Sequence, residues 1–514
     1  MGDIFFTTNP AEFSKLEGLY ISERKPPGFI RGRDLSTTGI AGRCVRGPDA
    51  PQVITSSGQF LDIYDGRDYG SGGALVGQIW AALLNKPFGT LVTRRVRASD
   101  AVKASFTLET ATGGAGTPVL RVDASSVGAW GNLVSVSVVA ATDGNVNHFD
   151  LITQYKGKQI RLPNLDITTG NDNTAIVVGS DVARYVDLTK LADGRPVNST
   201  PSTDGADAAG FILLGQTGVA GFTGVLGTEG TLAVTDYNAG MNDLAVFPDV
   251  AVAMVPETVA GSVATFHSNI VTLAASVSDR IFLTWSQAHG QSVSTEVTQV
   301  GTQITTRSDR IVWAYNSLYT VDPENAQKIQ QGPHIWLGSI LSQTDIDIHA
   351  GSVDAIPFLA GATAVTNTTL QRSDLIALKN AGISTVEKNS DGFQFHSVVT
   401  TSLTPGLTEL TRRRMTDFLQ LSASSRLRTY VKARNTAERR ASMAGELTAF
   451  SQTLKDTPRV IEDYEIDQES VNNATQRGRG EEHLLWRVRL IGHILSLVFE
   501  TDISTGTVIE RKAA

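Results

Sequence analysis

The chain has 514 residues, of which 41% are hydrophobic and 19% charged, and its formal net charge is −8. This length exceeds what one hydrophobic core supports, so we expect about two to four domains, and the composition excludes a disordered chain. Glycine is abundant, with 48 residues, and aromatic residues make up only 7%, which favours strands and loops over long helical bundles. The one cysteine, Cys44, excludes an intrachain disulfide. It is interpreted as a small buried residue, with a catalytic thiol as the minor alternative.

Residues 1–30 show no periodic pattern and are predicted to form an extended N-terminal arm. Two prolines and a glycine in residues 23–29 hold the backbone extended there. The N-terminus has an acidic residue where a secretory signal needs basic ones, and Phe6 stands where a myristoylation signal needs Ser or Thr. No apolar run reaches membrane-spanning length. We therefore expect a soluble protein made in a cytoplasm, without direct membrane insertion.

Residues 31–96 are predicted to form the first part of a core. Between residues 30 and 66, short apolar stretches cut by Gly and Pro indicate small strands with tight turns. Residues 71–86 have the apolar spacing of a helix, and residues 91–99 follow as a strand.

Residues 97–235 differ from their surroundings, because Gly, Thr, Ser, Asp and Asn dominate and apolar residues come in short alternating runs. Such runs, separated by polar loops, predict a β-rich domain inserted into a larger fold. The domain closes with glycines at every third position from 215 to 230, which we interpret as a re-entry loop. A collagen helix would need proline there, and a phosphate-binding loop would need a following lysine. The predicted strands are 134–142, 148–155, 175–180, 183–188 and 210–215.

From residue 236 to residue 500, apolar strands alternate with helical segments. This order predicts an α/β (mixed α+β) core with helices packed on a partly parallel sheet. Residues 501–514 are strand-like, have no core of their own, and are predicted to form a C-terminal arm. The predicted strands are 249–256, 280–285, 310–319, 383–388, 393–402, 459–466 and 483–499, and the predicted helices are 257–278, 294–304, 373–382, 407–420 and 437–456.

Residues 405–440 carry nine arginine and lysine residues against three acidic ones, a local balance of +6 in a chain of net charge −8. Charge segregated on this scale indicates a partner. Phosphate contacts to nucleic acid are one use, but the acidic remainder and the scarcity of interleaved aromatic residues argue against it. A protein with an acidic surface explains the block as well, and a solvated helix face remains the plain alternative.

Motifs for zinc, nucleotide or nucleophilic chemistry do not occur in the sequence. Asp345, Asp347 and His349 alternate, which on a strand would place three potential metal ligands on one face. The preferred interpretation is a solvated strand face or a turn, with Ile346 and Ile348 buried. We expect no cofactor and no metal.

Several stretches, taken in their order along the chain, resemble the sheath subunits of contractile phage tails and related injection machines. PPGFI and the RGP turn at 46–48 are similar to the opening of that family, and VGAWGN at 127–132 is similar to a motif of its inserted domain. LLGQTGVAGFTG stands at the family's glycine-rich re-entry loop, with Gln216 in place of the second glycine. The resemblance spans nearly the whole chain. It departs from the family near Pro357, where a Pro-Ala-Asn segment is usual.

The resemblance implies a structural protein and not an enzyme. Such a subunit polymerises as helical rings around a tail tube and contracts to drive the tube through a host envelope. Its partners would be further copies of itself, the tail tube protein, and baseplate and tail terminator proteins, without nucleic acid, in a virion assembled in a bacterial cytoplasm. Arms that add strands to neighbouring subunits would include Phe29, Ile30, Val508 and Ile509. The basic helix would hold an acidic tube surface through Arg412, Arg413, Arg414, Arg426 and Arg428.

A second class of function stays open. The insertion, rich in Gly, Thr and Asn, also fits a carbohydrate- or cell-surface-binding β-protein, which would need an aromatic platform. The insertion offers Trp130, Tyr155 and Tyr185, which are widely spaced in the sequence. An enzyme that acts through Asp345 or His349 is the third alternative.

Overall fold

The computed structural model describes residues 4–6, 19–21, 35–65, 90–111, 116–168, 170–199, 207, 209–216, 224–277, 279–321, 326, 328–352, 359, 361–390, 392–456 and 460–493. The chain divides into a larger unit, Gly32–Leu421, and a smaller unit that combines Met1–Arg31 with Ser422–Ala514. The predicted helix at 71–86 lies outside the described residues, and so do the four predicted arm residues Phe29, Ile30, Val508 and Ile509.

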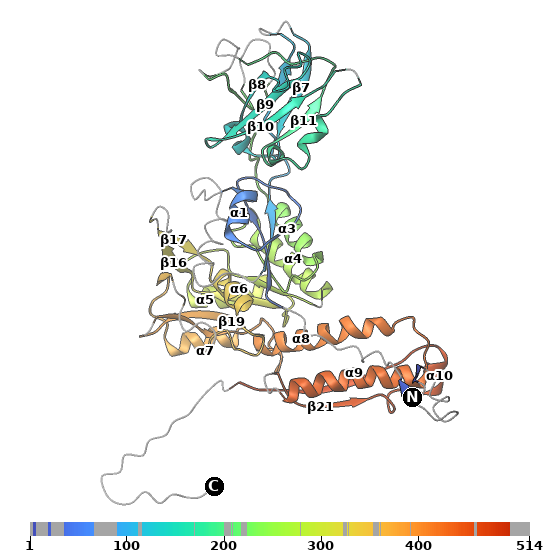
Figure 1. Ribbon diagram of the computed structural model, residues 1–514. Helices are drawn as coiled ribbons and strands as arrows, with labels where there is room; N and C mark the ends of the chain where they lie inside the picture. The colour runs from blue at the N-terminus through green and yellow to red at the C-terminus, as the bar shows by residue number, and fades with distance from the viewer. Residues whose placement is uncertain are drawn as a thin grey trace, which may run out of the picture. The chain divides into compact units, whose positions relative to one another are not determined.

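An eight-stranded sheet forms the centre of the larger unit, in the order β20-β19-β15-β14-β13-β3-β5-β4. Figure 1 shows the larger unit and labels β19, one of the strands of this sheet. Neighbouring strands from β19 to β5 are parallel, and β20 and β4 are antiparallel at the two edges, which confirms the predicted partly parallel sheet. β13, β14 and β15 are buried along their whole length, which is why their sequences read as apolar runs. The strands are β3 (Thr37–Arg43), β4 (Gln52–Ile54), β5 (Thr90–Val96), β13 (Val252–Met254), β14 (Ile281–Thr284), β15 (Ile311–Tyr315), β19 (Ile383–Lys388) and β20 (Phe393–Ser397).

Helices cover both faces of this sheet, and each face has its own hydrophobic core. One core takes side chains from α3, α4, α5 and α7, and the other from α1, α6 and the first turn of α8. α6 is buried on every side from Pro333 to Ser342, so its sequence has no polar stripe and was not predicted as a helix. The helices are α1 (Ser57–Tyr64), α3 (Val234–Val246), α4 (Val263–Ser276), α5 (Val293–Gln303), α6 (Pro333–Gln343), α7 (Arg372–Asn380) and α8 (Leu410–Leu427).

Two sequence predictions of local structure are wrong. Residues 57–64, assigned to small strands and turns, form α1, because Ser56 caps the helix by accepting a hydrogen bond from the Gln59 amide at 3.1 Å. Where a strand was predicted at 175–180, the chain instead begins with a 3-10 turn, η3 (Thr174–Val177). Of the apolar residues in this run, only Val177 lies in the core, and Val178 is 84% exposed. The run therefore does not pack one face against a core, as a half-buried strand would.

The predicted insertion consists of two antiparallel sheets, in the orders β10-β9-β8-β12 and β11-β7-β6. One hydrophobic core joins them, with buried residues that run from Ala104 to Leu214. These residues lie inside the predicted boundaries, 97 and 235, which themselves stay a prediction. The strands are β6 (Ser105–Glu109), β7 (Pro118–Ala124), β8 (Ser135–Ala140), β9 (Phe149–Tyr155), β10 (Lys158–Leu165), β11 (Val186–Lys190) and β12 (Ile212–Leu213).

Two smaller groups of strands complete the described chain. In the larger unit, β16 (Leu318–Val321) lies between β17 (Lys328–Gln331) and β18 (Ala362–Val365). In the smaller unit, β1 (Ile4–Phe6) pairs in parallel with β2 (Leu19–Ile21).

The smaller unit also holds α9 (Ala437–Asp456), α10 (Ala474–Gly478) and the antiparallel pair of β21 (Ile461–Asp467) and β22 (Leu485–Leu490). No helix among the described residues is both long and apolar enough to cross a membrane.

Candidate functional site

The residues that the sequence offered for chemistry do not form a reactive site. Within the described ranges, no group of three His, Cys, Asp or Glu side chains could hold a metal ion. The segment with Asp345 and Asp347 is a turn, as the preferred interpretation allowed, and Ile346 and Ile348 pack against the core but are half-buried rather than buried. Cys44 is buried, as predicted, and burial raises the pKa of its thiol, which keeps it neutral and unreactive.

Trp130, Tyr155 and Tyr185 come together in the fold, but they do not form an open sugar platform. The ring centroids of Trp130 and Tyr155 are 5.6 Å apart, and those of Tyr155 and Tyr185 are 5.5 Å apart. All three side chains are buried, and the guanidinium of Arg46 lies over them, 5.0 Å from the Tyr185 ring. The aromatic residues therefore form a cation–π cage for a residue of the same chain.

Arg46 begins the RGP turn and ties the central sheet region to the insertion. Its Nη1 donates to the Arg184 carbonyl at 3.0 Å, and its Nη2 donates to the Asp62 carbonyl at 2.6 Å. Arg95 of β5, which is 1% exposed, makes a second tie by donating from Nη2 to the Val127 carbonyl at 2.9 Å. Sequence reasoning missed both roles, because the partners are main-chain carbonyls that no motif marks.

The VGAWGN motif closes the base of the insertion. Asn132 donates from Nδ2 to the Gly227 carbonyl at 2.9 Å and accepts from the Gly227 amide at 2.8 Å, which fixes the two chain passages to each other. Gly128 has φ +122°, a backbone conformation that residues with a side chain rarely adopt, so a substitution there would be strained. The motif is a structural clamp.

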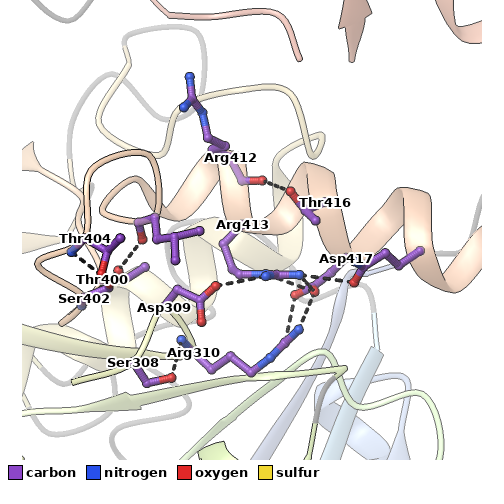
Figure 2. Close-up of polar contacts among 12 residues, drawn as sticks. Ser308, Asp309, Arg310, Thr400, Ser402, Thr404, Arg412, Arg413, Thr416 and Asp417 are labelled. Carbon is purple, nitrogen blue, oxygen red and sulfur yellow. Dashed lines mark hydrogen bonds and ion pairs between the residues drawn. The ribbon is translucent and has the colours of Figure 1, made fainter. Parts of the chain in front are cut away.

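The three consecutive arginines of α8 have three different environments. Arg413 pairs with Asp417, Nη2 to Oδ1 at 2.5 Å, and with Asp309 at 2.9 Å. Arg310, which precedes β15, binds Asp417 through both Nη atoms, at 3.1 and 2.8 Å. Figure 2 shows both guanidinium groups converging on Asp417, while Arg412 points away from the network. This buried ion cluster fixes α8 to the sheet.

Arg414 is 3% exposed and binds main-chain oxygens at the end of α6. Its Nη2 donates to the carbonyls of Leu341 at 2.7 Å and Thr344 at 3.3 Å, where the negative end of the helix dipole favours a cation. Burial lowers the pKa of Arg414 to about 10, and the nearby carboxylates of Asp345 and Asp347 partly offset that effect.

In the smaller unit, Arg426 at the end of α8 pairs with Glu446 of α9. Its Nε and Nη2 bind the two carboxylate oxygens at 2.9 and 2.8 Å, and the Tyr430 hydroxyl donates to the same carboxylate at 2.8 Å. Such a bidentate pair fixes the two helices against each other.

The other cations of the block are exposed, apart from Arg440, which is half-buried and donates to the Asn435 side chain at 2.9 Å. Of the five predicted tube-facing residues, Arg412 and Arg428 have exposed side chains, whereas Arg413, Arg414 and Arg426 bind groups of their own chain. The segment between α8 and α9 adds further exposed cations, and we call it the basic turn. It carries Arg428, Lys432 and Arg434, and Arg439 follows in the first turn of α9.

Within the described residues of the smaller unit, β21 and β22 pair only with each other. Each strand thus has one edge without a strand partner there, and such an edge can accept another chain. Trp486, Val488 and Leu490 are half-buried and alternate with the exposed Arg487 and Arg489.

The chain matches no protein-family profile and no curated protein sequence at a significant score. Solved structures do match it. A sheath tail protein from Desulfitobacterium hafniense is 14% identical with a TM-score of 0.58, over 92% of this chain and 100% of that one. A sheath tail protein from Listeria innocua is 11% identical with a TM-score of 0.62, over 90% and 97% of the two chains.

The contracted helical sheath of the anti-feeding prophage is also similar. It is 10% identical with a TM-score of 0.54, over 96% of this chain and 100% of that one. At identities this low, similarity over whole chains shows a shared fold and no more. The chain therefore has the fold of contractile sheath proteins, as its resemblance to that family predicted.

Proposed function

We propose that the protein is the structural subunit of a contractile tail or injection-system sheath, and that it has no catalytic activity. The observation that carries the proposal is the match over at least 90% of this chain to sheath proteins, one of them in a contracted helical sheath. In a phage the subunit would assemble in the bacterial cytoplasm, become part of the virion, and meet tail tube, baseplate and tail terminator proteins.

The edges of the β21–β22 pair are the proposed sites of connection between subunits. We expect the arms at 1–30 and 501–514 to add strands there, so that main-chain hydrogen bonds hold the lattice while its side-chain contacts change. The alternation of half-buried and exposed residues along β22 supports this, because an added strand would extend both faces of the pair.

Purified protein should form rings or tubes in negative-stain micrographs, and the C-terminal arm should be required. Changing both Val508 and Ile509 to proline removes two amide donors and should abolish tubes, because strand addition needs main-chain hydrogen bonds. Changing both to threonine keeps the amides and the β-branched shape, and should leave tubes in place.

Two results would contradict this proposal. A protein that stays monomeric at every salt concentration is not a sheath subunit. Tubes that form equally well with the proline variant would show that the C-terminal arm does not connect subunits. Circular dichroism spectra must match between the variants, so that loss of tubes reports assembly.

For contact with the tail tube, we propose the exposed Arg412 and the basic turn, which includes Arg428. Charge reversal of both, Arg412→Glu and Arg428→Glu, should weaken co-sedimentation of sheath with tube by tenfold or more at low salt, and less at high salt. Neither side chain is buried, so the subunit should still fold.

The matched control reverses Arg487, an exposed arginine on β22 that pairs with Glu465. This variant should keep its affinity for the tube. Equal tube binding by wild type and the double variant would rule out these residues as the contact.

A further inference from the structure

His148 lies where three loops meet at one end of the insertion. In the ladder between β9 and β10, Phe149 pairs with Leu165, so His148 and Asp166 are neighbours where that ladder ends. The His148 carbonyl accepts a hydrogen bond from Nε of Arg195, in the loop after β11, at 2.8 Å. The His148 side chain is 23% exposed, so water screens the contacts of its ring only in part.

Both ring nitrogens of His148 face carboxylate oxygens. Nδ1 lies 2.5 Å from Oδ2 of Asp143, and Nε2 lies 3.4 Å from Oδ2 of Asp166. A neutral imidazole has one N–H and can donate to one of them, whereas an imidazolium donates from both nitrogens. Nε2 is also 3.1 Å from Nδ2 of Asn145, an amide nitrogen that can only donate. Asn145 therefore suits the neutral ring and Asp166 suits the cation, so Nε2 has one partner for each protonation state.

The neighbouring charged groups on the adjoining strands pair with one another. These pairs are Asp150 of β9 with Arg161 of β10, and Lys190 of β11 with Asp193. Arg195 holds the main chain of His148 through its carbonyl, whatever the charge of the ring. The two carboxylates at the ring nitrogens, Asp143 and Asp166, are therefore the groups that decide whether the ring of His148 carries a charge.

The environment of the ring favours its protonated form. The hydrogen bond to Asp143, together with the charges of Asp143 and Asp166, raises the pKa of His148 above its ordinary 6.5, although burial offsets part of the rise. Hydrogen bonds from the Asn145 amide and from His148 lower the pKa of Asp143. Burial works to raise the pKa of Asp166, but hydrogen bonds from Thr168 outweigh it and lower that pKa. Both carboxylates are therefore ionised throughout the range in which His148 titrates.

We infer that His148 is a pH-dependent switch that joins the loop before β9 to the loop after β10. When the ring is protonated, it donates to both Asp143 and Asp166 and holds the two loops together. When Nε2 loses its proton, the bond to Asp166 is lost and the ring accepts from Asn145 instead, so the loops separate. The inference concerns the insertion alone and does not rest on the sheath role proposed above.

An NMR titration of dissociated subunits with isotope-labelled histidine measures the protonation of His148 directly. The chain has eight histidines, and the resonance that is missing from the His148→Gln variant identifies that of His148. In wild type this resonance should titrate above pH 6.5. In Asp166→Asn it should titrate at a lower pH than in wild type, because one of the two carboxylate charges is gone. Titration at or below pH 6.5 in wild type, or at the same pH in Asp166→Asn, overturns the inference.

Amide hydrogen exchange reports on the loops themselves. The contribution of a group with a raised pKa is full below pH 6.5 and is lost as the pH rises through its folded-state value. After correction for the intrinsic pH dependence of exchange, protection of residues 142–148 should therefore fall about two- to fivefold from pH 6 to pH 9, the range that a partly exposed ion pair supports. The His148→Gln variant should show the lower protection at both pH values.

The matched control is His396→Gln, on β20 of the central sheet. His396 pairs with one carboxylate, Nδ1 to Oε1 of Glu387 at 3.1 Å. Its substitution should leave the protection of residues 142–148 as in wild type at both pH values. An equal loss of protection with pH in wild type and in Asp166→Asn would show that the switch does not exist, and this comparison decides the question even if His148→Gln does not fold.

Discussion

Replacement of Asp417 with alanine is expected to destabilise the larger unit by about 3–5 kcal/mol. Asp417 is 3% exposed and accepts hydrogen bonds from two arginines, Arg310 and Arg413 (Figure 2). Its removal leaves Arg310 buried with a positive charge that has lost its carboxylate, which costs more than the loss of an exposed pair.

Urea unfolding followed by tryptophan fluorescence measures this effect, since Trp285, Trp313 and Trp336 are all buried on the central sheet. The urea midpoints are compared only if the slope of unfolding free energy against urea concentration is the same in both variants. This condition is needed because a chain of two units need not unfold in one step. The control is Thr416→Ala, the neighbouring residue, whose hydroxyl only donates to the Arg412 carbonyl at 2.9 Å. Equal midpoints for the two variants would show that the ion cluster does not stabilise the fold.

The Glu257→Gln substitution should stabilise the protein at pH 9 and have little effect at pH 5. Glu257 is 3% exposed, and burial raises the pKa of its carboxyl to about 8, from 4.5, with Arg43 offsetting part of the rise. Below pH 4.5 the carboxyl is protonated in both the folded and unfolded states. Between pH 4.5 and 8 the folded state holds a proton that the unfolded state has lost, so stability falls as pH rises through this window.

Glutamine cannot ionise, so its variant should not show this loss. The expected gain at pH 9 is about 5 kcal/mol, because the two pKa values, 4.5 and about 8, differ by 3.5 and each unit corresponds to 1.36 kcal/mol. Urea midpoints from pH 5 to pH 9 measure it, with Asp181→Asn, an exposed carboxylate in the same unit, as the control. A constant difference between wild type and Glu257→Gln across this range would contradict the buried ionisation.

The sequence predicted the parts of the fold whose signal is local. β14 and β15 stand out as short apolar runs, α4 as the helix before β14, and α5 as the helix between the two strands, because each pattern lies within one element. α6 was missed, since a helix buried on all sides has no stripe of polar residues. α1 was missed because its capping serine was read as part of a turn.

The candidate sites also could not be predicted where they depend on contacts between distant parts of the chain. The sequence marked the arginine block, yet it could not separate Arg412 from Arg414, which differ in exposure although they are two positions apart. The difference comes from α6, which brings main-chain carbonyls to Arg414 from about 70 residues away.

The order of strands in the central sheet also has a consequence for how the chain folds during synthesis. β3 lies beside β13, and the Arg43 amide bonds to Glu257, 214 residues further along. The insertion, whose core runs from Ala104 to Leu214, is complete before β13 emerges from the ribosome. Until β13 has been made, the edge of β3 that β13 will occupy has no strand partner in the nascent chain, and this edge is the most exposed to aggregation.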